Sequence, residues 1–337
     1  MLRFAALAVL AQVCSAAPVG DLLKRDASGP KMNGANFPGM CLCDFVQLCN
    51  ILTASADPSI IKVGSTWYSF ATNSGGRNIQ ISKSSDFNTW NLLNEDALPN
   101  LPSWANPNPS DTWAPDVSQL ADGSFVMYYT VRTSQDSQFH CVGAATSASI
   151  TGPYLPHTDE PLICDLSVGG AIDPAGYEEN GQRYVLWKVD GNANPGNPGP
   201  CGANNNPTPL YIQPVSSNGL TLQGSKSALV DNEGESDDGI VEAPSLAKSG
   251  STYVLFFSSG CYSTTNYKVN YATSSSLTSG YKRAANALFK SGTQGLSAPG
   301  GASIDRDAKH LVFHANYNSG RALWTDIISV NGDSVSA

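Results

Sequence analysis

The amino-acid sequence predicts an all-β fold built from repeated units of about four short strands, and three observations lead to this prediction. Glycine and proline are abundant, with 31 and 21 among 337 residues, so turns and short elements dominate over long helices. Apolar, aromatic-rich stretches alternate with turn signals and show no helical periodicity. The same pattern also recurs along the chain, which indicates a repeat architecture.

Each copy of the repeat begins with a small or acidic residue, and an aromatic-rich strand begins eleven residues later. Turn signals such as Gly64-Ser65 and Asn180-Gly181 separate the two strands, as expected for hairpins. A third strand is expected in three copies, over residues 81–85, 145–147 and 271–274. The copies begin at Asp57, Ala114, Asp173, Glu242 and, more faintly, Gly301.

Five such units predict a five-bladed β-propeller that occupies residues 26–337 as a single domain. A right-handed β-helix has shorter rungs than this repeat. A double β-sandwich gives no reason for a fivefold repeat. Both alternatives therefore fit less well.

The N-terminal residues 1–16 have the pattern of a secretory signal peptide, with Arg3 followed by an apolar run that is too short to span a bilayer. The dibasic pair Lys24-Arg25 predicts a propeptide over residues 17–25. A buried N-terminal strand or helix is the alternative. We expect the protein to be secreted.

Eight cysteines fit an oxidising compartment, where scattered cysteines form disulfides more often than metal sites. Removal of the signal peptide takes Cys14 and leaves an odd number, so one thiol is expected to be free or intermolecular. The sequence leaves the pairing open. The remaining cysteines are Cys41, Cys43, Cys49, Cys141, Cys164, Cys201 and Cys261.

The charge balance argues against several partners. The chain has 19 basic and 28 acidic residues, a net charge of -9, and no run of Lys and Arg that could neutralise phosphates. Nucleic acids and anionic membranes are therefore not expected partners. We expect a monomer.

Three acidic residues fall at one position of the repeat when the copies are aligned on the aromatic strand: Asp57, Asp173 and Glu242. The first strand of each propeller blade lines the central channel, so these carboxyl groups are expected to face one cavity. Confined like charges raise each other's pKa, which costs folding free energy. Carboxyl groups with separated pKa values are what glycoside hydrolysis requires, because one acts as acid and another as base.

Two other interpretations of the acids remain open. Acids beside proline at strand starts often cap turns or pair with arginine. Clustered carboxylates also bind calcium, although no Asp-x-Asp-x-Asp-Gly loop is present.

Five short motifs carry a family resemblance: Asp57-Pro58-Ser59, Trp113-Ala114-Pro115-Asp116-Val117, Ile172-Asp173-Pro174, Val241-Glu242-Ala243-Pro244 and Gly320-Arg321-x-Leu323. In this order and spacing they resemble glycoside hydrolase family 43, the five-bladed arabinanases, arabinofuranosidases and β-xylosidases. Each motif is weak alone, but together they span essentially the whole mature chain.

The resemblance implies that Asp57 is the general base, Glu242 the general acid, and Asp173 the residue that orients the acid and tunes its pKa. It also implies inversion of the anomeric centre, for which the two carboxyl groups stand roughly 6.5–9.5 Å apart. Arg321 matches a family arginine that contacts the sugar in the innermost subsite.

Two further residues are candidates for substrate binding. Trp113 could stack on the apolar face of a sugar, with blade packing as the alternative. His314 could face the channel, with a buried core histidine as the alternative.

One segment departs from the family. Members commonly have Gly-Pro-Gly-His in blade five, where the histidine lies near a channel ion or water, but residues 298–302 are Ala-Pro-Gly-Gly-Ala. We therefore expect no required cofactor and no essential metal. A structural calcium ion elsewhere in the channel stays an open alternative.

The sequence favours an arabinan-active enzyme, because no β-sandwich follows the fifth copy as it does in the two-domain β-xylosidases. The long segment 191–209 contains Cys201, and a loop tied by a disulfide is expected to close one end of the cleft and favour removal of terminal units. The expected activity is cleavage of α-L-arabinofuranosyl linkages in plant cell-wall arabinan or arabinose-containing hemicellulose. A β-xylosidase or an endo-arabinanase is the alternative within the family, and a non-catalytic carbohydrate-binding propeller is the alternative from another class.

Overall fold

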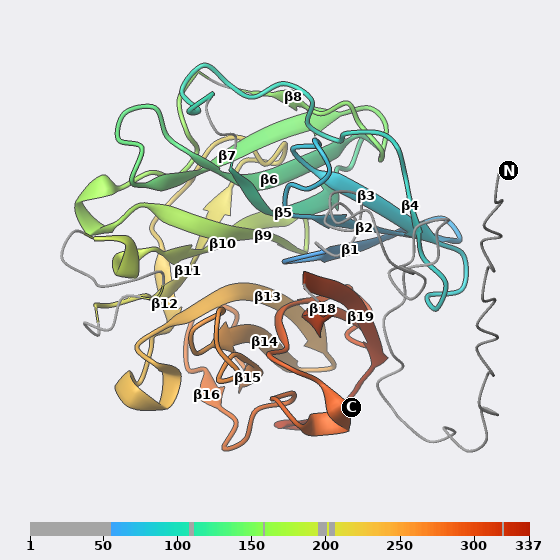
Figure 1. The fold of residues 1–337 in the computed structure, drawn as a ribbon, viewed down its shortest axis with the longest axis vertical. Helices are drawn as coiled ribbons and strands as arrows, with labels where there is room; N and C mark the ends of the chain where they lie inside the picture. Colours follow the sequence, from blue (N-terminus) through green and yellow to red (C-terminus); the bar gives the residue numbers. More distant parts are fainter. Residues whose placement is uncertain (1–54, 108–110, 158, 195–200, 202–205, 319) are drawn as a thin grey trace, which may run out of the picture.

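The computed structural model describes residues 55–107, 111–157, 159–194, 201, 206–318 and 320–337. Within them, antiparallel sheets are arranged as blades around a common centre (Figure 1). The predicted signal peptide, the propeptide, and Cys41, Cys43 and Cys49 lie outside these residues. No helix in the described part of the chain is long and apolar enough to cross a membrane.

Each blade sheet is built from strands that follow one another in sequence. Blade one contains β1 (Ser59–Val63), β2 (Thr66–Ala71), β3 (Gln80–Ser84) and β4 (Asn91–Leu92); blade two contains β5 (Thr112–Gln119), β6 (Phe125–Arg132), β7 (His140–Ser147) and β8 (Leu155–Pro156). Blade three contains β9 (Ala171–Glu179), β10 (Gln182–Val189), β11 (Leu210–Val215) and β12 (Ser227–Val230); blade four contains β13 (Val241–Ser249), β14 (Thr252–Ser259), β15 (Lys268–Ser274) and β16 (Lys282–Arg283).

Blade five has three strands in the described residues, and a short hairpin follows it. These strands are β17 (Gly300–Ile304), β18 (His310–Tyr317) and β19 (Gly320–Ile327), followed by β20 (Ser329–Asn331) and β21 (Ser334–Ser336). The connections include the 3₁₀ turns η2 (Leu166–Val168), η3 (Gly191–Ala193), η4 (Gly234–Asp237) and η5 (Thr293–Gly295).

The predicted hairpins form where the turn residues allow them. In blade three, Glu179 pairs with Gln182, and the two residues between them, Asn180 and Gly181, have φ of 53° and 79°. Positive φ at both central residues gives a turn whose twist matches that of the flanking strands. Local sequence therefore fixes the register of this hairpin.

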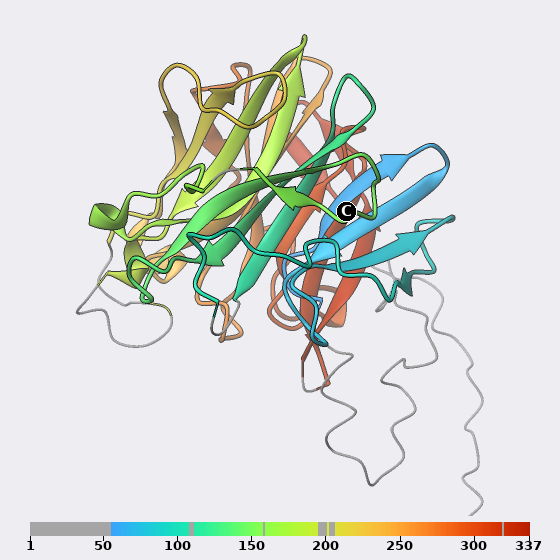
Figure 2. The same cartoon turned by 90° about the horizontal axis from the view of Figure 1, so that it is seen from above.

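The blades close into a ring. The first strand of each blade contacts the first strand of the next, in the order β1, β5, β9, β13, β17 and back to β1. Seen from above, the strands run through the thickness of this ring (Figure 2). The predicted five-bladed β-propeller is confirmed.

A hydrophobic cluster fills each boundary between neighbouring blades. Strand β6 shows how the sequence achieves this: Met127 and Tyr129 pack toward blade one, whereas Val126 and Tyr128 pack toward blade three. Side chains alternate between the faces of a strand, so a continuous apolar run serves two boundaries at once.

Candidate active site

One residue near the start of each blade's first strand has a left-handed backbone, and the ladder of β5, β9, β13 and β17 shifts register at the same place. Such bulges bend a strand and redirect its side chains. The left-handed residues are Asp57 (φ 49°), Ala114 (42°), Asp173 (54°), Ala243 (52°) and Gly301 (58°).

The predicted register is wrong by one residue in blade four. Ala243, and not Glu242, occupies the position of Asp57 and Asp173, so Glu242 precedes the left-handed residue. The aromatic alignment misplaced it because Tyr253 is the second residue of β14, whereas Tyr68 and Tyr184 are the third residues of β2 and β10. The proline that follows the left-handed residue in four blades marks the position correctly.

A cavity of about 620 Å³ opens at the centre of the propeller and contains the predicted triad. Its volume falls in the range of small-molecule sites. The lining includes five of the six predicted site residues, together with four that sequence reasoning missed: Asp57, Trp113, Asp173, Glu242 and Arg321, then His140, Lys188, Tyr262 and Tyr267.

Asp57 is held by a residue of its own blade and by a residue of blade five. The hydroxyl of Thr72 donates to its Oδ2 at 3.1 Å, and its own backbone N–H donates to Nδ1 of His314 at 3.0 Å. Burial raises the pKa of Asp57, the positive charge of Arg321 acts in the opposite direction, and the charge of Glu242 raises it further. The residue is therefore fixed in orientation and surrounded by charges of both signs.

His314 lies behind Asp57, is completely buried and does not line the cavity. It is therefore not placed to contact a sugar directly. Burial, and then the charge of Arg321, lowers the pKa of His314 well below its ordinary value, so the ring is neutral. The 3.5 Å approach of Nδ1 to Asp57 Oδ1 is accordingly not an ion pair. Its buried Nε2 has no hydrogen-bond partner among the described residues.

Asp173 faces the same cavity from blade three. Its backbone N–H donates to the Thr130 hydroxyl at 3.0 Å, and its Oδ2 accepts the N–H of Ala243 at 2.9 Å. Burial raises the pKa of Asp173 well above the ordinary value, and the negative charges of Glu242 and Asp57 add to this effect. Asp173 is thus suited to hold a proton close to Glu242.

Glu242 receives a hydrogen bond at each carboxyl oxygen. The hydroxyl of Tyr267 donates to Oε1 at 2.7 Å, and Nζ of Lys188 donates to Oε2 at 3.0 Å. Burial raises the pKa of Tyr267 well above its ordinary value, so the phenol stays neutral and donates. A Cβ atom on Gly300 would lie 1.9 Å from the Tyr267 ring, so this close approach requires glycine and fixes the tyrosine.

Trp113 forms an aromatic wall of the cavity. Its ring stacks on His140 with centroids 3.8 Å apart and an interplanar angle of 28°. Burial lowers the pKa of His140 to about 3, so a neutral ring supports the indole. One face of Trp113 thus packs on His140 while the residue lines the cavity, and its stacking on a sugar stays a prediction.

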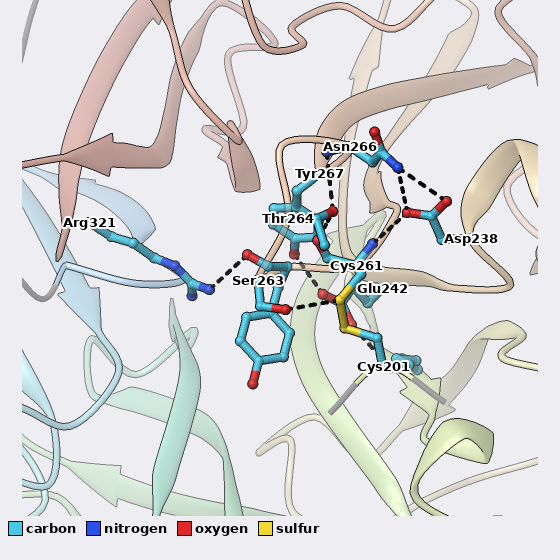
Figure 3. Close-up of a disulfide and its surroundings, with 11 residues drawn as sticks. Cys201, Asp238, Glu242, Cys261, Ser263, Thr264, Asn266, Tyr267 and Arg321 are labelled. Atoms are coloured by element: carbon cyan, nitrogen blue, oxygen red, sulfur yellow. Dashed lines mark hydrogen bonds and ion pairs between the residues drawn. A yellow bond between two sulfur atoms is a disulfide. The ribbon is translucent and has the colours of Figure 1, made fainter. Parts of the chain in front are cut away.

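Arg321 and Tyr262 meet in the lining of the cavity. Figure 3 shows Arg321 and the nearby disulfide. The guanidinium lies 5.1 Å from the tyrosine ring centroid and donates from Nη2 to the Tyr262 carbonyl at 3.3 Å. Cys261, directly before Tyr262, is bonded to Cys201 in the long segment between β10 and β11. The disulfide therefore fixes Cys201 next to Tyr262.

The second disulfide joins Cys141 and Cys164 in blade two. The two bonds resolve the pairing of four cysteines that the sequence left open. The free or intermolecular thiol stays a prediction, because the other three mature cysteines lie outside the described residues.

The channel ion associated with the family does not fit the residues of blade five. A Cβ atom on Gly301 would lie 2.7 Å from Nδ1 of His314 and 2.8 Å from Oδ1 of Asp57, which leaves no room for a histidine side chain there. The described residues also contain no group of three His, Cys, Asp or Glu side chains arranged to hold a metal ion. No step of the chemistry is therefore assigned to an ion.

Sequence comparison supports the same interpretation. The profile of glycosyl hydrolases family 43 matches residues 51–330. An extracellular endo-α-(1→5)-L-arabinanase of Bacillus subtilis is 27% identical over 280 residues, which cover 77% of this chain and 79% of the relative. The Thermotoga petrophila enzyme of the same name is 40% identical over 153 residues, covering 42% of this chain but only 30% of its own length.

Solved structures share the fold. A thermostable family-43 glycoside hydrolase superposes with a TM-score of 0.71 at 21% identity, covering 83% of this chain and 91% of that one. The native arabinanase of Bacillus subtilis gives 0.62 at 23% identity, covering 84% and 97%. Since the family profile spans all five blades and contains the carboxyl cluster, the chain belongs to glycosyl hydrolase family 43.

Proposed function

We propose that the protein is a secreted O-glycosyl hydrolase that cleaves α-L-arabinofuranosyl linkages of arabinan with inversion. The observation that supports this most directly is the convergence of Asp57, Asp173 and Glu242 on one cavity, each with different partners. The similarity to enzymes named arabinanases supports the substrate, and the word "extracellular" in their names supports secretion.

In this mechanism Asp57 removes a proton from water, which attacks the anomeric carbon from one side of the sugar. Glu242 donates a proton to the departing glycosidic oxygen on the other side. Asp173 keeps the acid oriented through Ala243, whose N–H it accepts. Arg321 and Trp113 bind the sugar at the cavity wall during these steps.

We further propose that the enzyme removes terminal units. Asn192 and Ala193 from the long segment line the cavity, and the Gln138 side chain donates to the Ala193 carbonyl at 2.7 Å. The Cys201–Cys261 bond holds Cys201 beside Tyr262. Residues fixed at both of these places support a closed subsite over an open groove.

Endo action is the second candidate, because the named relatives are endo-arabinanases. The two modes leave different products on linear α-1,5-arabinan. Arabinose alone indicates exo action, whereas a ladder of oligosaccharides indicates an open cleft and refutes the role of the long segment.

Glu242→Gln tests the chemistry itself. General acid catalysis contributes about 10²–10⁴-fold, so we expect the variant to lose activity by that factor. Glu235→Gln, which changes an exposed glutamate on η4, is the matched control and should retain activity. Proton NMR of the first product formed tests for inversion.

Unchanged hydrolysis by Glu242→Gln would refute the assignment. Binding of arabinan oligosaccharides without hydrolysis of arabinan, xylosides or galactans would support the carbohydrate-binding propeller instead.

A further inference from the structure

A ring of hydrogen bonds joins neighbouring blades at the level of the left-handed residues. In four of the five steps, a side chain in or directly after a blade's second strand accepts the backbone N–H of the left-handed residue in the following blade. The acceptors are Thr72 Oγ1 for Ala114 (3.1 Å), Thr130 Oγ1 for Asp173 (3.0 Å), Ser258 Oγ for Gly301 (2.8 Å) and His314 Nδ1 for Asp57 (3.0 Å).

Lys188 occupies the corresponding position in blade three. The equivalence follows from the strand register, because each of these residues pairs with the residue just before the bulge. The pairs are Lys188 with Ile172, Thr130 with Trp113, Ser258 with Glu242 and His314 with Gly300.

A lysine cannot complete the ring as the other residues do. An ammonium group has no acceptor, so Lys188 cannot take the N–H of Ala243. The Asp173 carboxyl group accepts that N–H instead, at 2.9 Å. In blade three, the buried cation Lys188 therefore stands where the other blades have an acceptor, and Asp173 accepts the Ala243 N–H in its place.

The ammonium group contacts carboxylates on two sides. Its Nζ lies 3.0 Å from Oε2 of Glu242 and 3.0 Å from Oδ1 of Asp190, and the side chain is 1% exposed. Burial alone would lower the pKa of Lys188, but the charges of Asp190, Glu242 and Asp173 outweigh it and raise the pKa above its ordinary value. Lys188 therefore remains charged.

We propose that Lys188 is a positioning residue that holds Glu242 in place and strengthens it as a proton donor. The proposal rests on the assignment of Glu242 as the general acid. When the O–H bond of Glu242 breaks and the proton bonds to the leaving oxygen, a carboxylate forms beside the ammonium, and the charge of the pair changes from positive to zero. Stabilisation that grows along the reaction lowers its barrier.

The pair does not stand alone, and the surrounding charges define the pH response. Lys188 is the cation nearest to the acid, so its removal should dominate any change. The groups that face the pair are Asp190 after β10, Asp173 on β9, Tyr267 before β15 and Asp57 before β1, and Arg321 on β19 interacts with Asp57.

Lys188→Met removes the charge and keeps an unbranched side chain that is one heavy atom shorter. An opposite charge within about 4–6 Å moves a carboxyl titration by about 1–3 units, so we expect the alkaline limb of the kcat/KM profile to rise by about 1 pH unit. At the wild-type optimum, kcat should fall about tenfold while KM stays within about twofold, because the effect acts through the acid.

Two variants serve as controls. Lys188→Arg keeps the charge and should leave the alkaline limb in place. Lys248→Met removes a surface lysine that is ion-paired with Glu179, and should change neither kcat nor the profile.

Asp190→Asn gives a second test, of opposite sign, that remains available if Lys188→Met does not fold. Without the Asp190 charge, Glu242 is the only one of the two carboxyl groups left to pair with the Lys188 ammonium, so the alkaline limb should move to lower pH. A folded Lys188→Met with an unmoved limb overturns the proposal, as does an unmoved or raised limb in Asp190→Asn. If Glu242→Gln is inactive in the same assays, either result refutes only the role of Lys188; an active Glu242→Gln refutes the proposed function.

Discussion

Gly301 is the position where the smallest possible change should separate backbone strain from damage to the active site. Its φ is +58°, and an added Cβ would lie 2.8 Å from Oδ1 of Asp57 and 2.7 Å from Nδ1 of His314. Gly250 in the β13–β14 turn has nearly the same φ, +60°, but a Cβ there would meet no described atom within 4 Å. An alanine at either position therefore has the same backbone strain, but only at Gly301 does its Cβ also collide with active-site side chains.

We expect Gly250→Ala to lose about 1 kcal/mol of unfolding free energy from the left-handed conformation alone, with activity unchanged. Gly301→Ala should lose at least that amount and also displace either the Asp57 carboxylate or the His314 ring. A displacement of a catalytic group by about 1 Å can cost about 10²-fold in rate, so kcat should fall by a factor of that order.

Urea unfolding followed by fluorescence measures the free-energy change, and arabinan hydrolysis measures kcat on the same samples. Folded Gly301→Ala with wild-type kcat would refute the packing argument around Asp57. A loss of kcat in Gly250→Ala of similar size would show instead that strain anywhere in the propeller reaches the active site.

Two further predictions concern stability. Phe313 is completely buried at the boundary of blades four and five. Phe313→Ala should lower the free energy of unfolding by about 3–5 kcal/mol, as measured by urea unfolding. Burial raises the pKa of Asp116 to about 7, so the folded protein keeps a proton that the unfolded chain releases above its ordinary pKa of 3.8. Stability should therefore fall as pH rises between these values; Asp116→Asn removes this loss, so it should be more stable than the wild type at about pH 8 but not at about pH 4. The amide oxygen introduced by this substitution can still accept the Gly176 N–H that Asp116 Oδ2 accepts at 2.8 Å, and an equal stability gap at both pH values would contradict the prediction.

Much of the fold followed from local sequence. The turn at Asn180-Gly181 predicted a hairpin correctly because positive φ at two adjacent residues is a property of those residues themselves. The position of Glu242 did not follow, because an aromatic residue on either face of a strand is compatible with packing between blades. The proline after Ala243 was the better marker, since it tracks the bulge.

The acids of the site could be predicted, whereas their partners could not. Asp57 and Asp173 lie in short motifs, but Lys188 comes from the far strand of a hairpin, and its contact with Glu242 crosses a blade boundary. A single lysine inside the apolar stretch from Tyr184 to Val189 was the available signal, because buried lysines are rare without a partner. Identifying Glu242 as that partner required the structure, because blades three and four meet only when the propeller is assembled.

The seam of the propeller links completion of the fold to activity. Within the described residues, blade five is made only of strands that follow residue 299, and it meets blade one through side chains and through a backbone hydrogen bond from the Ser55 N–H to the Arg321 carbonyl at 3.1 Å. His314 and Arg321 belong to the last blade in the sequence, yet they surround Asp57 in the first. A chain that ends before blade five would contain all three acids but lack His314 and Arg321 around Asp57. We therefore expect activity only after the last blade has been synthesised and has packed against the first.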